Sequence, residues 1–468
     1  MSNFQTIKAM KKLHAITLVI LAFMSALANA QNVTPVDFMD TNPYQLRNNP
    51  SVVMPYDSHF SLVIGNICGD FRNLNFRLEN AFGYDASGRP TVIDLKQLAN
   101  SLNPENSMNS TFDMEVLGFG RKLRHGYLTY SHRVRFQSNC NYTDDLFQLA
   151  ASGNAAFVGE NNPADMKMDM NLLGFQEFAV GYQICPTEKL SVGGRVKLLF
   201  GAAEMQTEAC HVQLYTDPET YALRLREDMA VRVASPMPFH VEDGKFVFNN
   251  CRFDFTHLFC SPGFGIDLAA SYRLGEKFSM TAAVNDLGFI SWKKTAVMLN
   301  GQIADCGEFY DDGSFLFQGL DVNDIQKLVS DEEYRKWFVE NLGNYFDFTS
   351  ENLEPYTTML HTNFLLRGAY SLNEKHRFIA QMQGYCSGLG FRSAFTMAYN
   401  GHLNKYFDLC ATYSMMKNSF DNIGIGVTCN LKFFHLYLAT NNIIGCFNPL
   451  NTSGVNIQAG IFFTVRDN

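Results

Sequence analysis

The sequence lacks long apolar runs and an excess of basic residues, and each absence excludes a class of protein. No apolar stretch approaches 18 residues in the 468-residue chain, whereas a membrane-spanning helix needs about 20. Helical membrane spans are therefore excluded. Basic residues are also too few for a nucleic-acid-binding surface, since 37 Lys and Arg stand against 46 Asp and Glu, which gives a net charge of −9. Because phosphate binding needs a basic face, nucleic acid is not expected as a partner.

Motifs of catalysis and metal binding are missing as well. The sequence has no HExxH zinc motif and no GxSxG nucleophile elbow, and its 11 cysteines include no CxxC pair. Most cysteines stand singly in strand-like runs, which favours a role as small apolar residues, although disulfides remain an alternative in an exported protein. We therefore predict no enzyme, no catalytic residue, no metal and no cofactor.

The first thirty residues have the features of a secretory signal peptide. Lys11 and Lys12 precede a short apolar run, and Ala28-Asn29-Ala30 has the small-x-small pattern of a cleavage site. We predict export with cleavage near Ala30, and the division of the chain follows from it. Residues 1–30 are the signal peptide, 31–57 an N-terminal periplasmic or lumenal segment, and 58–468 the folded body.

Long segments in which apolar and polar residues alternate dominate the mature chain. In one of them, apolar side chains occupy every second position and mostly polar ones lie between them, from Val455 to Arg466. Side chains of a strand point alternately to its two faces, so each such segment has one apolar and one polar face. The runs span ten to fourteen residues, longer than the usual 5–6 of soluble strands and close to the 9–11 of membrane barrels.

Tight connections alternate with longer ones between these segments, as in outer-membrane barrels, which have short periplasmic turns and long outer loops. We predict an all-β, transmembrane, antiparallel up-and-down β-barrel of about 14 strands, with both termini on the periplasmic side. The predicted strands begin near Ser58, Thr111, Gly126, Asn171, Lys189, Pro262, Lys277, His361, Arg377, Phe391, Tyr406, Asn422, Phe434 and Gly454.

The long extracellular loops are predicted to contain further structure. Val92–Leu102 and Asp144–Ser152 are typical of short helices, and Asn323–Asn341 of a longer amphipathic one. Tyr221–Val233 alternates well enough to form an additional hairpin arm beyond the barrel.

Charged residues on the predicted polar faces would meet in the lumen. If the alternation holds, these residues form a lumen-facing network of Arg133, Arg135, Glu177, Arg195, Lys197, Asp267 and Arg273. Two interpretations remain open, a packed network that rigidifies the barrel and a lining that selects a small solute. A wall opening, if there is one, is expected at Gly193-Gly194 or at the bend of Asn285–Gly288.

Several segments resemble a known group of proteins. "GFQEFAVGY" from Gly174, "LSVGGRVKLLFG" from Leu190, "GFGIDLAASYRL" from Gly263 and "NDLGFISW" from Asn285 resemble an uncharacterised, domain-of-unknown-function family of outer-membrane barrels of Bacteroidota. The family is related to the PorV and PorP barrels of type IX secretion and more distantly to FadL. "RNNPSVVMP" resembles the Asn-Pro motif of the family's relatives, which here is Asn49 and Pro50. The resemblance implies a barrel of about this strand number, without catalytic residues or an assigned substrate.

Two functions are compatible with these observations. The first is passage of a small or hydrophobic solute across the outer membrane. The alternative is a non-transporting scaffold, or a surface- or secretion-associated barrel, that binds a partner protein through its long loops. In both, outer-membrane lipid surrounds the barrel.

Overall fold

The computed structural model describes most of the mature chain. It covers residues 33–54, 58–73, 77–84, 90–219, 223–234, 239–242, 245–248, 259–292, 296–303, 315–317, 333, 346–387, 390–416, 419–448 and 451–466. The predicted signal peptide and its cleavage site near Ala30 lie outside these residues.

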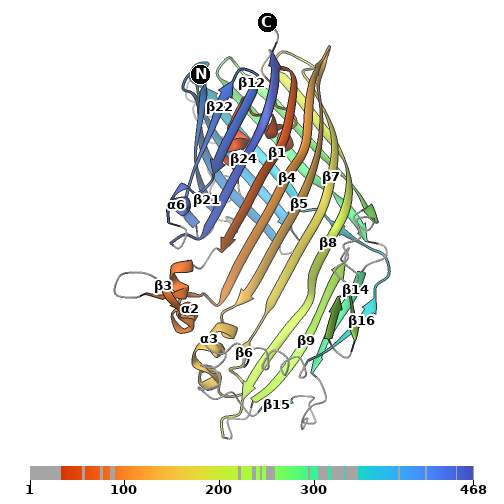
Figure 1. Ribbon diagram of the computed structural model, residues 1–468, viewed down its shortest axis with the longest axis vertical. Coiled ribbons are helices and arrows are strands. Elements are labelled where there is room, and N and C mark those ends of the chain that lie inside the picture. The colour runs from red at the N-terminus through yellow and green to blue at the C-terminus, as the bar shows by residue number, and fades with distance from the viewer. Residues whose placement is uncertain are drawn as a thin grey trace, which may run out of the picture.

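Strands that follow one another in chain order form a closed antiparallel barrel of 14 strands (Figure 1). They are β1 (Ser58–Asn73), β4 (Glu105–Leu123), β5 (Gly126–Thr143), β7 (Met168–Ile184), β8 (Leu190–Thr216), β12 (Ser261–Leu274), β13 (Phe278–Trp292), β18 (Thr362–Ser371), β19 (His376–Ser387), β20 (Gly390–His402), β21 (Phe407–Met416), β22 (Ser419–Leu431), β23 (Phe434–Thr440) and β24 (Gly454–Arg466). The last strand pairs with the first, from Ser58 opposite Arg466 to Arg72 opposite Gly454. This closure removes the free strand edges, and it confirms the predicted fold class and strand count.

The strands begin within a few residues of the predicted positions, with one exception. β4 begins at Glu105 rather than near Thr111. Its first residues are polar except for Met108 and carry no apolar alternation, yet they pair with β5 from Glu105 opposite Thr143. Backbone pairing therefore extends this strand beyond the part that its side chains reveal.

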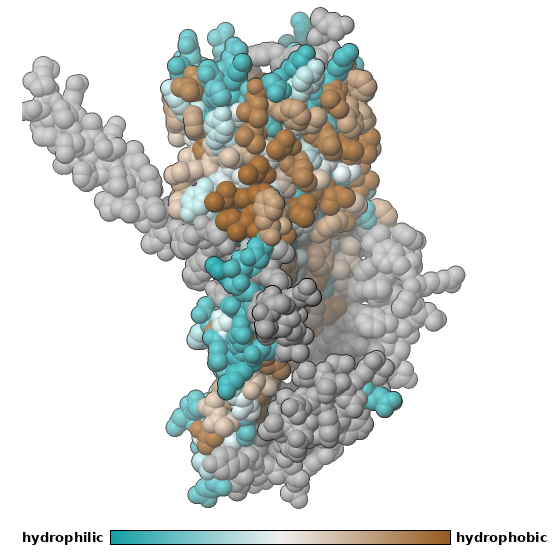
Figure 2. All heavy atoms as spheres, turned by 60° about the vertical axis from the view of Figure 1, so that its left-hand side comes forward, coloured by the Kyte–Doolittle hydropathy of each residue, from teal (hydrophilic) through white to brown (hydrophobic). Residues whose placement is uncertain are grey.

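Apolar side chains point outward and polar ones inward along the barrel strands. In β24 the apolar Ile457 and Val465 are exposed, at 54% and 53%, whereas Asn456, Gln458 and Thr464 are buried inside. Exposed apolar side chains are present on many strands around the barrel, and Figure 2 shows them as a band bordered by hydrophilic residues at one end. The predicted apolar and polar faces of the strands are thus confirmed.

No helix within the described ranges is long and apolar enough to cross a membrane.

The two ends of the barrel differ in their connections. At one end, here called the turn end, strands are joined by tight turns such as 275–277 and 373–375, and β1 begins and β24 ends there. At the opposite end, here called the loop end, most connections are longer. An even number of strands places both strand termini at the same end.

An extension of the sheet continues beyond the loop end (lower half of Figure 1), where β8 and β9 are labelled. β8 is 27 residues long, and its last part pairs with β9 (Leu223–Ala234). β9 pairs with β14 (Ala296–Ile303) and β15 (Phe315–Phe317), and β14 pairs with β16 (Phe346–Asn352). The predicted arm at Tyr221–Val233 is confirmed by β9.

Two predicted loop helices are also confirmed. They are α2 (Leu95–Ser101) and α3 (Asp145–Ser152), which pack together, with Gln148 Nε2 donating to the carbonyl oxygen of Ala99 at 3.0 Å. The predicted helix at Asn323–Asn341 lies outside the described residues, apart from Glu333. The remaining short elements are η3 (Leu78–Ala81), β2 (Phe82–Tyr84), β3 (Pro90–Ile93), η4 (Asn154–Ala156), β6 (Ala164–Asp165), β10 (Phe239–Glu242), β11 (Lys245–Phe248), β17 (Tyr356–Met359) and α6 (Ile443–Phe447).

Candidate functional site

Residues 33–54, here called the hatch, lie inside the barrel (Figure 1, behind β24 and β1). They form two 3-10 turns, η1 (Pro35–Phe38) and η2 (Pro43–Arg47). Each turn begins with a proline, whose missing N–H has no intrahelical partner at that position anyway. Phe38 and Met39 are fully buried and pack with Tyr437 and Phe462 of the wall. The hatch therefore fills part of the lumen with its own small apolar core.

Polar contacts attach the middle of the hatch to one wall. The guanidinium of Arg47 forms an ion pair with Glu115 of β4, with Nε 3.1 and 3.2 Å from the two carboxylate oxygens. The backbone carbonyl of Arg47 accepts a bond from Arg195 Nη1 at 3.0 Å. Asn285 Nδ2 donates to the carbonyl of Asn48 at 2.8 Å. Residues 47 and 48 are thus held by strands β4, β8 and β13.

The first half of the hatch is attached to the opposite wall. Asp40 pairs with Arg377 and accepts a bond from Asn400 Nδ2 at 3.0 Å. Thr41 donates to Asp408 Oδ2 at 2.9 Å. All these contacts are non-covalent.

Burial also affects Asp37 within the hatch. Loss of solvation raises the pKa of this carboxyl above its ordinary value, although a hydrogen bond from Asn48 Nδ2 at 2.6 Å and the nearby charge of Arg367 oppose the shift.

The Asn-Pro motif of the hatch lies against the inner face of the wall, very close to one glycine of β8. Asn49 Oδ1 accepts bonds from the backbone N–H and the hydroxyl of Ser51, at 3.2 and 2.7 Å. The carbonyl of Ser51 accepts a bond from Ser191 at 2.7 Å. A Cβ built on Gly193 would lie 1.9 Å from the carbonyl oxygen of Pro50. Only glycine leaves room for the hatch backbone at this point of β8.

Substitution of Gly193 is therefore expected to displace the hatch. Gly193→Ala should expose the segment around Pro50 to added protease and raise the leak of small ions, because two backbones would otherwise clash. Gly194→Ala is the matched control, since its Cβ would lie 3.3 Å from the flexible end of Leu268 and 3.4 Å from the carbonyl oxygen of Asp267, and neither atom belongs to the hatch. Equal protection of the hatch in both variants, measured by limited proteolysis in detergent, would contradict the assignment.

The predicted charged residues meet in the lumen, with one exception. Glu177 of β7 accepts from Arg135 and Arg195 at 3.0 and 3.1 Å, and from Arg133 at 3.4 Å. Asp267 of β12 pairs with Lys197 at 2.6 Å and Arg195 at 3.1 Å. The exception is Arg273, which shares their inward parity but lies at the turn end, exposed, where it bonds the carbonyl of Glu188.

Three acids missing from the predicted network complete this charged cluster. Asp113 pairs with Arg133, and Asp286 lies 2.8 Å from Arg135 and 2.5 Å from Lys197; Glu115 binds Arg47 of the hatch. With Arg47 included, the cluster contains five cations and five anions. Its members are Arg47, Asp113, Glu115, Arg133, Arg135, Glu177, Arg195, Lys197, Asp267 and Asp286. It is therefore electrically balanced.

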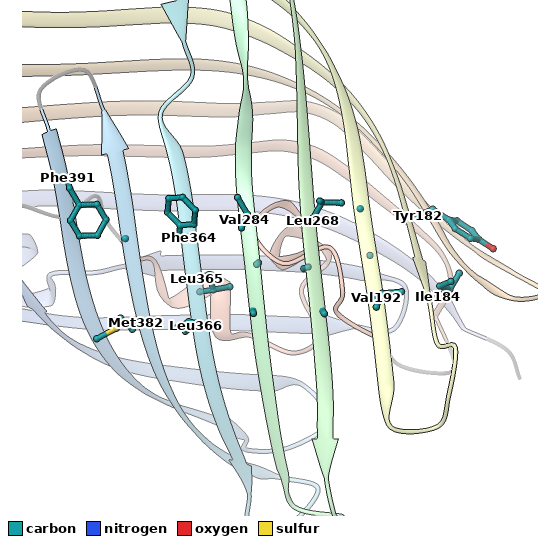
Figure 3. Close-up of a pocket in the computed structure, with 17 residues that line it drawn as sticks. Tyr182, Ile184, Val192, Leu268, Val284, Phe364, Leu365, Leu366, Met382 and Phe391 are labelled. Carbon is teal, nitrogen blue, oxygen red and sulfur yellow. The ribbon is translucent and has the colours of Figure 1, made fainter. Parts of the chain in front are cut away.

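The outer wall carries an apolar hollow of about 810 Å³ (Figure 3). It extends across β7, β8, β12, β13, β18, β19 and β20, and its lining includes Val192, Leu268, Ala270, Ala282, Phe364, Met382 and Phe391. Its floor has small residues on both faces of the sheet: Gly194, Ala270 and Ala282 point outward, and Gly193, Ala269 and Ala283 inward. The hatch lies directly behind this floor, at Gly193.

Next to the hollow the sheet is irregular, where the sequence predicted a bend. The pairing of β12 with β13 shifts register between Ile266 and Leu268. Opposite this shift, Asp286 adopts a φ of +59°, an uncommon conformation for a residue other than glycine. β13 pairs with β18 only up to Asn285 and with β17 from Phe289.

Within the described part of the chain, no group of three or more His, Cys, Asp or Glu side chains is arranged to hold a metal ion.

Comparisons place the chain among known proteins. A family described as "Family of unknown function (DUF5723)" matches residues 50–441. Among solved structures, the toluene transporter TodX of Pseudomonas putida is similar at 11% identity and a TM-score of 0.42, with 94% of this chain and 99% of that one covered. The toluene transporter TbuX of Ralstonia pickettii is similar at 10% identity and 0.44, with 94% and 100% covered.

A FadL homologue of Pseudomonas aeruginosa is similar at 8% identity and a TM-score of 0.37, with 92% and 96% of the two chains covered. A search of curated proteins found no match.

Proposed function

Since the chain belongs to the family of unknown function DUF5723, its role has to follow from its geometry, and we propose that it passes a small apolar solute across the outer membrane. The hatch closes the lumen, and the apolar hollow admits or releases the solute through the side of the barrel. The observation that carries this proposal is the hollow, with its thin floor backed by the hatch.

The outer face supports a location in lipid. Leu268, Leu366 and Leu438 lie on different strands and are 56%, 57% and 61% exposed. A soluble monomer rarely exposes a continuous apolar surface of this extent, whereas the outward face of a membrane barrel is apolar. The predicted signal peptide would supply the export that this location requires.

The groups inside the lumen favour a path through the wall. The hatch and the charged cluster occupy part of the lumen, and burying an apolar solute among ten charges would remove their partners at a large cost. The hollow offers the opposite environment, because apolar side chains line it. Small residues on both sides of its floor mean that a slight separation of β12 and β13, beside their register shift, would connect the hollow with the lumen.

Filling the hollow tests the proposal. Ala270→Phe combined with Ala282→Phe places two rings in the hollow from a directly paired position, facing lipid. We expect uptake of fluorescent N-phenyl-1-naphthylamine by cells that produce the barrel to slow roughly tenfold, since a filled site has no room for a solute.

The matched control is Ala411→Phe, which also points outward but lies on β21, away from the hollow. Heat-modifiable gel mobility reports whether each variant is folded. Equal uptake by the filled variant, the control and the parent would refute transport through the hollow.

A non-transporting scaffold is the second candidate function. The balanced, filled lumen favours it, and so does the extension built on β8, β9, β14 and β16, which offers surface to a partner protein beyond the loop end. This function requires no solute path, so uptake by the filled variant would equal that of the parent, and both would equal that of cells without the barrel.

A further inference from the structure

A second layer of polar side chains crosses the lumen near the loop end. Arg392 lies two residues from the start of β20, and its Nη1 donates to Asn139 Oδ1 of β5 at 2.6 Å and also to Asn109 of β4. β20 and β5 lie on opposite walls of the barrel. Arg392 therefore reaches across the lumen.

Neighbouring residues complete this layer. Tyr385 of β19 is paired with Arg392 in the sheet, and its hydroxyl lies 2.8 Å from His361 Nδ1 and 3.4 Å from Gln137 Oε1 of β5. His361 Nε2 lies 3.2 Å from Asn171 Oδ1 of β7. A solute that enters the lumen from the loop end meets these groups before it reaches the charged cluster.

The charge of Arg392 is not compensated by any described residue. Its bonding partners are two neutral amides, and no carboxylate of the described chain lies within ion-pair distance of it. This differs from the charged cluster, in which every cation has an acid beside it. A cation that is 5% exposed and lacks a counter-charge is costly, because burial removes its hydration.

One edge of the guanidinium, Nε and Nη2, makes no hydrogen bond to a described residue. Both hydrogen bonds use Nη1, and neither Nε nor Nη2 is among the buried nitrogen atoms that lack a partner, so this edge is accessible to a small probe. Asn109, which binds Arg392 through its Oδ1, has a buried and unsatisfied Nδ2. The hydroxyl of Ser107, two positions away on the same face of β4, is also buried and unsatisfied. The Nε–Nη2 edge is the pair of parallel donors that binds a carboxylate at two points.

We propose that Arg392, with Asn109 and Ser107, forms a binding site for an anionic group, a carboxylate or a phosphate ester, on the solute that enters the lumen. An acceptor-only group with a negative charge supplies what the site lacks: a counter-charge for Arg392 and acceptors for the two unsatisfied donors. The inference deepens the proposed function and rests on it in one respect, that a solute passes between the hollow and the lumen. It makes that solute an amphipathic acid rather than a plain hydrocarbon.

Binding of two probes of nearly equal size tests the site directly. 4-Fluorobenzoate carries a carboxylate and 4-fluorobenzyl alcohol is neutral, and both are titrated into the full-length protein in detergent and followed by ¹⁹F NMR. Arg392→Gln should weaken binding of 4-fluorobenzoate by roughly tenfold or more, since a charge-assisted bidentate contact is lost. It should leave 4-fluorobenzyl alcohol unchanged. Arg392→Lys keeps the charge but loses the two parallel donors. Its affinity for 4-fluorobenzoate should therefore lie between those of the parent and the Gln variant.

The matched control is Arg273→Gln, which removes the same charge from an exposed position at the turn end. Equal benzoate affinity in the parent and Arg392→Gln would overturn the proposal, as would an equal loss in Arg273→Gln. A parallel loss of both probes in Arg392→Gln and Arg392→Lys would also overturn it, because the arginine would then only hold the walls together. The measurement needs no transport, so benzoate binding can succeed where uptake through the hollow fails, and the reverse.

Discussion

Removal of the hatch is expected to turn a barrel that passes no measurable ion current into one that shows discrete conductance steps. Deletion of residues 33–54 takes away a segment that lies inside the lumen and contacts both of its walls. Fully filled lumens belong to barrels of about eight strands, and open aqueous channels to those of 16–18, so a barrel of 14 strands has room for water once the hatch is gone. Discrete conductance steps in a planar bilayer, absent from the full-length protein, are the expected result.

The deletion also leaves Glu115 without Arg47, and a buried unpaired carboxylate would destabilise the barrel on its own. The deletion is therefore best combined with Glu115→Gln, with full-length Glu115→Gln as the control. The control should remain silent, because its hatch still has the contacts of Asp40, Thr41 and Asn48. A folded, hatch-free barrel without conductance would show that the charged cluster and the Arg392 layer close the lumen by themselves.

The fold could be predicted from the sequence because a closed barrel repeats one rule along the whole chain. Each strand faces lipid on one side and the lumen on the other, so the period of two survives over its full length. The rule fails where contacts are made by backbone alone. β4 is an example, since its first residues pair with β5 through main-chain hydrogen bonds and show no apolar alternation.

Two further acids of the charged cluster could have been predicted from the same alternation of side chains. Asp113 and Glu115 alternate on β4, and the tight turn to β5 places them opposite Arg135 and Arg133. An acid-x-acid pair facing a basic-x-basic pair in one hairpin is a signal that depends only on the register of the turn. The predicted network included the two arginines and left out the two acids that lie opposite them on β4.

Asp286 could not have been found in this way. From the alternation along β13, Asp286 should point outward and Leu287 inward. The backbone of Asp286 instead takes a φ of +59°, and the alternation is reversed from this residue on, so that Asp286 is buried and Leu287 exposed. Both Asn285 and Asp286 are buried in consequence. The hatch contacts could not be predicted from the sequence either. They join residues 47–51 to strands far along the chain, and no local sequence pattern indicates them.

Neutralising the acid at the centre of the charged cluster is expected to cost more stability than any other substitution considered for this barrel. Glu177 is fully buried and lies beside Arg133, Arg135, Arg195 and Lys197. Glu177→Gln keeps the shape of the side chain but leaves one surplus positive charge in a fully buried site. We expect the free energy of unfolding to fall by about 3–5 kcal/mol, the usual cost of breaking a buried ion pair from one side. Urea unfolding in lipid vesicles measures it.

A second substitution decides whether the loss comes from charge imbalance or from packing. Arg133→Met in the Glu177→Gln background restores the balance, and Asp113 keeps Arg135 as a partner at 3.6 Å. The double variant should therefore be more stable than Glu177→Gln alone, with a favourable coupling of about 1–3 kcal/mol between the two positions. Glu276→Gln, an exposed change in a turn, should move stability by less than about 0.5 kcal/mol. If the double variant instead showed the sum of the two single losses, charge balance would not be what holds the cluster together.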